Sequence, residues 1–128
     1  DIMKSIKSFL AAFYLLDQCY WIEQTDPLGM LLGMMNPEIW EDGHPADLVL
    51  YEDWRDRAGK KEITEENLLE AVISYVEYYG KYLDFNFSQT LKILRTQIGP
   101  PQICLAIQRA QEKFEKHPQT YSREAYSG

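Results

Sequence analysis

The periodicity of the apolar residues in the first 22 positions constrains the fold of this chain more than any other feature. These residues recur at alternating steps of four and three, the spacing of one face of an amphipathic α-helix. The members of this stripe are Ile2, Ile6, Phe9, Phe13, Leu16 and Tyr20. Four further residues widen it: Met3, Leu10, Tyr14 and Trp21. Because the last turns are apolar on almost every side, we predict that this helix is the central element of the fold.

Five more helices are predicted after it. Residues with N-capping or first-turn preferences stand before each apolar pattern. The predicted start residues are Asp26, Asp47, Thr64, Ser88 and Pro101. Gly59 and Gly99 are the predicted stops of the third and fifth helices. No segment alternates apolar and polar residues as a strand does. We therefore predict an all-α fold, a single compact bundle of about six helices over residues 1–117, followed by a loosely ordered polar tail of residues 118–128.

Several single residues are predicted to be structural. Gly29 and Gly33 lie four apart on one face of the second helix, where a missing side chain lets a neighbouring helix approach. Gly43 follows an aspartate in a predicted turn, and Trp54 lies on the inner face of the third helix. Asp17 projects into the apolar stripe of the first helix, so its carboxylate needs a partner. We expect it to accept backbone N–H bonds from a nearby loop or helix start; a partner-contacting or proton-handling acid is the alternative.

The acidic residues are concentrated in residues 38–70. This segment holds eleven of the twenty acids and four of the thirteen bases, so it carries a formal charge of −7 while the other 95 residues are neutral. Nucleic acid is disfavoured as a ligand, because a phosphate backbone requires clustered Lys and Arg. Complementary charge favours a basic partner. The alternative is that the negative face only aids solubility.

The candidate partner-binding residues lie in the first part of this segment. Helix starts and caps account for other acids of the segment: Asp47, Glu62, Glu65 and Glu66. Among the remaining acids, the nominated partner-binding residues are the loop acids Glu41 and Asp42 and the outer acids of the third helix, Glu52, Asp53 and Asp56. Tyr51 and Trp54 are expected in the core. Trp40 is the aromatic residue that we expect to be exposed and to serve as an interface anchor, since interfaces are enriched in Trp and Tyr.

Little in the sequence indicates catalysis. His44 and His117 are the only histidines, and neither a nucleophile motif nor a Gly-rich phosphate loop is present. Asp42, His44 and Asp47 offer ligands for a hard cation, but the calcium-loop and H-E-x-x-H patterns are absent. A structural turn with exposed acids is therefore favoured over a metal site, and we expect no cofactor.

The two cysteines, Cys19 and Cys104, lie in apolar helical patterns without metal-ligand spacing. We predict two buried, reduced thiols, which suits the cytoplasm; a disulfide between the two helices is the alternative. No run reaches the roughly 18 apolar residues of a membrane span. Residues 9–16, behind two lysines, imitate a short signal peptide. They are followed directly by Asp17 and Gln18, and we interpret them as a core helix.

Three motifs resemble those of a known family. They are residues 26–33 (DPLGMLLG), residues 40–47 (WEDGHPAD) and residues 52–54 (EDW). Together with the long aromatic helix before them, they resemble a family of small bacterial immunity proteins that accompany contact-dependent growth inhibition and related polymorphic toxins. The resemblance covers about residues 5–58. It implies a cytosolic antidote that binds a toxin domain, often a nuclease, and blocks its active site or an essential surface.

The charge distribution agrees with this resemblance, because a nuclease surface that binds phosphates is basic and an acidic protein can cover it. The leading hypothesis is an immunity protein without activity of its own, a monomer when free, that binds a basic cognate toxin domain. Two alternatives stay open. One is a helical adaptor or regulatory subunit of a cellular complex, and the other is a metal-dependent hydrolase built on Asp42, His44 and Asp47.

Overall fold

The computed structural model describes residues 1–58 and 61–127. Within these residues the chain forms seven α-helices, one short 3-10 helix and no strand beyond a single bridge between Met3 and Ile63. The elements are α1 (Ser5–Ile22), α2 (Asp26–Met35), α3 (Leu48–Arg57), α4 (Leu68–Tyr82), α5 (Ser88–Thr96), α6 (Pro100–Lys116), α7 (Pro118–Tyr121) and η1 (Glu124–Tyr126). The predicted all-α bundle of about six helices is confirmed. Gly59, the predicted stop of the third helix, lies outside the described residues.

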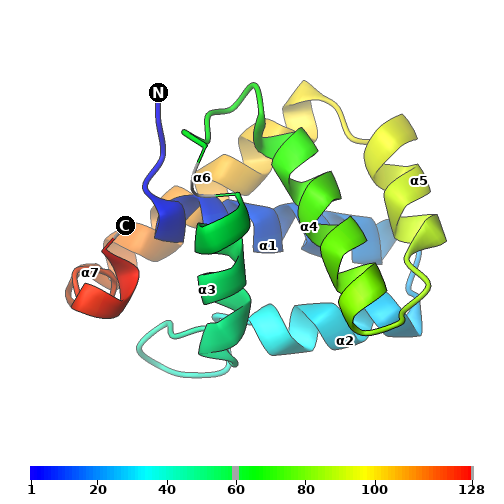
Figure 1. Ribbon diagram of the computed structural model, residues 1–128. Helices are drawn as coiled ribbons and strands as arrows, with labels where there is room; N and C mark the ends of the chain where they lie inside the picture. The colour runs from blue at the N-terminus through cyan, green and yellow to red at the C-terminus, as the bar shows by residue number, and fades with distance from the viewer. Residues whose placement is uncertain (59–60, 128) are drawn as a thin grey trace.

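Helix α1 is the centre of the bundle. It packs against α2, α3, α4, α5 and α6, and Figure 1 shows it crossing the middle of the molecule, with α3 and α4 in front of it. Ile6 and Leu15, which point to opposite sides of this helix, are both fully buried. The predicted central position is therefore confirmed. Trp21 differs from the prediction: it lies in the last turn of α1, outside the core, and is 72% exposed.

Buried aromatic residues connect α1, α3 and α4. Trp54 of α3 is fully buried; its Nε1 donates to Ser8 Oγ of α1 at 2.8 Å. Its ring meets the ring of Tyr75 of α4 edge-on, with centroids 5.3 Å apart. The Tyr75 hydroxyl donates to the Leu50 carbonyl at 2.6 Å. Because a buried donor without a partner is costly, these bonds permit polar aromatic side chains in the core. Trp54 and Tyr51 occupy the core as predicted.

Most helices begin where their capping residues predict. Asp47 accepts the Val49 N–H at 3.0 Å and caps α3, and α5 begins at Ser88. The prediction for Thr64 is wrong, because α4 begins at Leu68. Asn67 Oδ1 accepts the Thr64 N–H at 2.7 Å, so the residues after Thr64 form a separate turn before the helix starts.

The two glycines of α2 have different surroundings. A Cβ added at Gly29 would lie 3.2 Å from a ring carbon of Tyr20, so α1 approaches closely there, as predicted. At Gly33 the prediction is wrong: a Cβ would meet no atom within 4 Å, and the residue is exposed. This part of α2 faces solvent instead of a neighbouring helix.

Asp17 is held by α6. Its carboxylate pairs with Arg109 Nη1 at 3.4 Å, and 26% of its side chain is exposed. The partner is thus a guanidinium group instead of the backbone N–H groups expected from the sequence. Because Asp17 keeps part of its contact with solvent, its desolvation penalty is smaller than full burial would impose.

The loosely ordered tail predicted after residue 117 is instead folded. Residues 118–126 contain α7 and η1, and the side chains of Tyr121 and Tyr126 are only 4% and 3% exposed. The Tyr121 ring stacks on Phe114 of α6 at a centroid distance of 5.8 Å. The prediction failed because two aromatic side chains, without any helical periodicity, are enough to fix this polar segment to the bundle.

The cysteines are both free thiols. Burial raises the pKa of the Cys19 thiol to about 12. The predicted burial of Cys104 is wrong: it is exposed, because the buried positions of α6 are Ala106 and Ala110 on another side of the helix. None of the helices in the described ranges has the length and apolar character needed to cross a bilayer.

Candidate functional site

The segment between α2 and α3, residues 36–47, is a loop closed at its base by backbone hydrogen bonds. The Ala46 N–H donates to the Asn36 carbonyl at 3.0 Å, and the Asp47 N–H donates to the Met34 carbonyl at 2.9 Å. Within the loop, the Gly43 N–H donates to the Trp40 carbonyl at 3.1 Å. The turn predicted at Gly43 is therefore present, and the loop lies beside the first turn of α3 (Figure 1).

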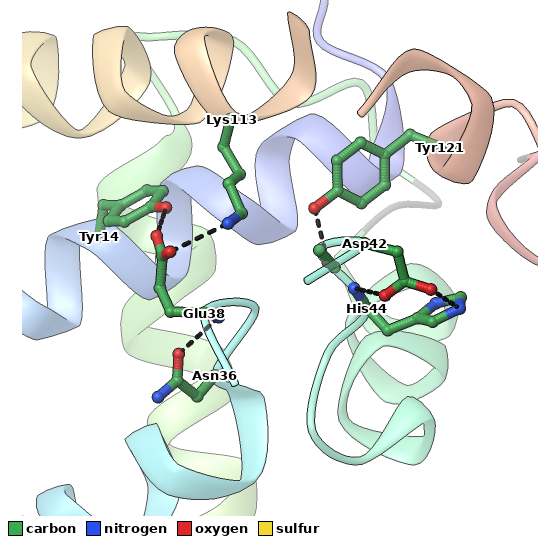
Figure 2. Close-up of polar contacts among 8 residues, drawn as sticks. Tyr14, Asn36, Glu38, Asp42, His44, Lys113 and Tyr121 are labelled. Atoms are coloured by element: carbon green, nitrogen blue, oxygen red, sulfur yellow. Dashed lines mark hydrogen bonds and ion pairs between the residues drawn. The ribbon is translucent and has the colours of Figure 1, made fainter. Parts of the chain in front are cut away.

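Both the backbone conformation at position 43 and the neighbouring side chains require a glycine there. Its φ of +84° lies in the left-handed region that favours glycine. The Tyr121 hydroxyl donates to its carbonyl at 2.6 Å, and a Cβ at this position would lie 2.5 Å from that hydroxyl oxygen. Figure 2 shows Tyr121 reaching from the C-terminal segment toward this turn. No larger residue fits here without displacing a buried tyrosine.

Four large apolar side chains are exposed around this loop. Ile39 and Trp40, in the loop, are each 56% exposed; Leu48 and Val49, in the first turn of α3, are 40% and 52% exposed. The exposure predicted for Trp40 is confirmed. Sequence reasoning missed the other three, although Leu48 and Val49 lie off the inner stripe of α3 and could have been recognised from that. Exposed apolar groups with polar surroundings are typical of protein interaction sites.

The five acids nominated from the sequence have different environments. In the described part of the chain, Glu41 and Glu52 have no hydrogen bond or ion pair. Asp56 pairs with Arg55 at 3.1 Å on the surface. Asp53 is half-buried and accepts a hydrogen bond from the hydroxyl of Tyr79 of α4. The acids available for an external partner are therefore Glu41, Glu52 and Asp56.

Asp42 is tied to the neighbouring histidine (Figure 2). Its Oδ1 accepts the backbone N–H of His44 at 3.2 Å, and its Oδ2 lies 3.1 Å from His44 Nε2. Asp47, the third residue of the alternative metal site, accepts the Val49 N–H instead. The residues that the structure describes contain no group of three or more metal-ligating side chains. The favoured interpretation of this stretch is a structural turn.

Glu38 is not among the acids nominated from the sequence, yet it holds the start of the loop (Figure 2). Its Oε1 accepts the Tyr14 hydroxyl at 2.5 Å, and its Oε2 pairs with Lys113 Nζ at 2.9 Å. Partial burial raises the pKa of the Glu38 carboxyl, but the bonds from Tyr14 and Lys113 outweigh it and hold the pKa below the usual 4.5. These partners lie far from Glu38 in sequence, so no local pattern could have revealed them.

This lowered pKa predicts an acid dependence of stability. A carboxyl group whose folded pKa is depressed stabilises the fold above its unfolded pKa, and this contribution is lost as the pH falls through the folded pKa. We expect the unfolding free energy of the wild type to exceed that of Glu38→Gln above pH 4.5. Below pH 4.5 the difference shrinks. Urea unfolding of both proteins at several pH values measures this difference in unfolding free energy. A difference that grows as the pH falls would contradict the lowered pKa of Glu38.

Comparisons of the chain with protein-family models, curated proteins and solved structures give no match. The resemblance to immunity proteins therefore stays a prediction from the three motifs. The structure itself defines a class of surface: exposed apolar side chains of a loop and a helix start beside exposed or half-exposed acids, two of which have no ion pair among the described residues.

Proposed function

We propose that this chain is an immunity protein that binds and neutralises a basic toxin domain through the surface formed by residues 39–41, 48–49, 52 and 56, hereafter the acidic surface. The observation that carries the proposal is the exposure of Trp40 beside Glu41, an acid that has no hydrogen bond or ion pair within residues 1–58 and 61–127. An exposed aromatic residue supplies contact area at an interface centre. Glu41 and Glu52, together with the surface-exposed Asp56, supply negative charge that a cationic surface can meet.

The physical chemistry of this surface favours a basic protein over other partners. Complementary charge accelerates encounter and selects against partners of the wrong sign. Burial of the apolar side chains then slows dissociation. Salt screens the charges over about 8 Å at physiological ionic strength, so the association should weaken as salt rises. In this proposal the chain acts in the cytoplasm as a monomer and forms a one-to-one complex.

The functional test uses the C-terminal domain encoded by the gene immediately upstream. We expect that expression of this domain alone arrests bacterial growth and that co-expression of the present chain restores it. The two purified proteins should elute as one complex. Arrested growth without rescue would refute the immunity function. A stable complex with a domain that has no effect on growth would instead favour the alternative adaptor function.

Trp40 allows a sharper test of the surface. Its truncation to alanine removes the largest exposed side chain of the loop, and interface hot spots of this kind contribute about 2 kcal/mol or more, which corresponds to about 30-fold in affinity. We expect Trp40→Ala to bind the toxin domain about 30-fold more weakly, measured by calorimetric titration. Trp21→Ala is the matched control, because Trp21 is also exposed but lies at the end of α1. Equal affinities of the two variants would place the interface elsewhere.

A further inference from the structure

We propose that residues 118–126, hereafter the C-terminal clasp, hold the turn at Gly43 and His44 and thereby order the loop that presents Trp40 and Glu41 to the partner. This inference rests on the proposed function for its binding consequence. The structural part of the inference is that the clasp keeps the loop ordered. This part is argued only from contacts within the chain.

Three side chains of the clasp bond to two consecutive loop residues. The Tyr121 hydroxyl donates to the Gly43 carbonyl at 2.6 Å. The Tyr126 hydroxyl lies 2.6 Å from His44 Nδ1, and Arg123 Nη1 lies 2.8 Å from His44 Nε2. A segment of nine residues thus holds both the backbone and the side chain of the turn.

The clasp is itself fixed to the body of the molecule. The Tyr126 ring lies 5.3 Å from the ring of Tyr51 of α3 and 5.7 Å from that of Tyr121. Tyr121 in turn stacks on Phe114 of α6. Burial raises the pKa of both clasp tyrosines, that of Tyr126 to about 12, so their hydroxyl groups stay protonated near neutral pH. The turn is therefore attached to rigid elements of the bundle.

The loop has few hydrogen bonds of its own. Between its closed base and its tip, the bonds within the loop include the Gly43 N–H to the Trp40 carbonyl and the His44 N–H to Asp42 Oδ1. A loop that must become ordered on binding lowers the affinity, whereas a preorganised loop avoids this loss. Glu38 fixes the start of the loop, and the clasp orders its tip before a partner binds. In this account Asp42 and His44 are positioning residues that connect the clasp to the loop carrying Trp40.

The first test measures loop order without a partner. The double variant Tyr121→Phe, Tyr126→Phe removes both hydroxyl groups, and with them two hydrogen bonds to the turn, but keeps both rings. We expect hydrogen exchange of the Gly43 and His44 amides in this variant to accelerate about tenfold or more. The amides of α1 should keep their wild-type rates. Tyr82→Phe is the control, since Tyr82 is 68% exposed. Unchanged exchange rates at Gly43 and His44 would contradict the proposal that the clasp orders the turn.

The second test connects the clasp to binding. We expect the toxin domain encoded upstream to dissociate about tenfold faster from the double variant than from the wild type. Equal dissociation rates would overturn the role of the clasp in binding. If the wild type does not bind this domain at all, the proposed function fails together with the binding role. The exchange result then decides the structural role of the clasp by itself.

Discussion

Replacement of Trp54 by alanine is expected to lower the free energy of unfolding by about 3–5 kcal/mol, the range for truncation of a large buried aromatic side chain. Trp54 is fully buried between α1 and α4, and its ring meets Tyr75 edge-on. The variant also loses the bond from Nε1 to Ser8 Oγ. Because a single domain is stable by about 5–15 kcal/mol, this change removes a large part of the total. Urea unfolding followed by circular dichroism measures it.

The matched control is Trp21→Ala. Trp21 is 72% exposed, and we expect its removal to change the unfolding free energy by no more than about 0.5 kcal/mol. Both variants replace a tryptophan by alanine. A difference between their unfolding free energies therefore reports the burial of the side chain and not its type. Similar losses in the two variants would show that the core is not centred on α1, α3 and α4.

The fold could be predicted from the sequence where local physics decides it. The four-and-three spacing of apolar residues in α1, the cap at Asp47 and the start of α5 at Ser88 depend on residues within about one turn of each other, so they are visible in the sequence. The start of α4 could not be predicted, because Asn67 Oδ1 accepts the Thr64 N–H and the residues between them form a separate turn before the helix. The order of residues 118–126 was missed for a related reason: it depends on contacts with distant residues.

The candidate site was predictable in part. The exposure of Trp40 follows from its place in a loop that lies outside every helical stripe. The internal partners of the acids were not predictable: Tyr79 binds Asp53 across 26 positions, and Lys113 binds Glu38 across 75. Such pairs arise only when helices far apart in sequence pack together. The structure thereby reduces the nominated acids to Glu41, Glu52 and Asp56 as the ones available to a partner.

The second large effect is expected on binding. Reversal of charge at these three acids in the triple variant Glu41→Lys, Glu52→Lys, Asp56→Lys should weaken the complex with the toxin domain by about 100-fold or more, because like charges then face each other across the interface. The fold should persist, since the ion pair of Asp56 with Arg55 is on the surface and such pairs contribute little to stability. A urea midpoint of unfolding equal to that of the wild type would verify that the triple variant keeps its fold.

A second triple variant controls for net charge. Glu23→Lys, Glu65→Lys, Glu70→Lys alters three exposed acids outside the acidic surface. Each triple variant replaces three acids by three lysines, which moves the formal charge by six, from −7 to −1. A difference in affinity between the two triple variants therefore depends on the positions of the substituted charges and not on the net charge.

The most direct test of the acidic surface is calorimetric titration of the wild type and both triple variants with the C-terminal domain encoded by the gene immediately upstream, the proposed toxin, at low and at physiological salt. We expect one-to-one binding by the wild type that weakens with salt. The variant at Glu41, Glu52 and Asp56 should lose about 100-fold in affinity, and the control variant less than about threefold. Equal affinities of the two variants would contradict the assignment of this surface as the site of partner binding.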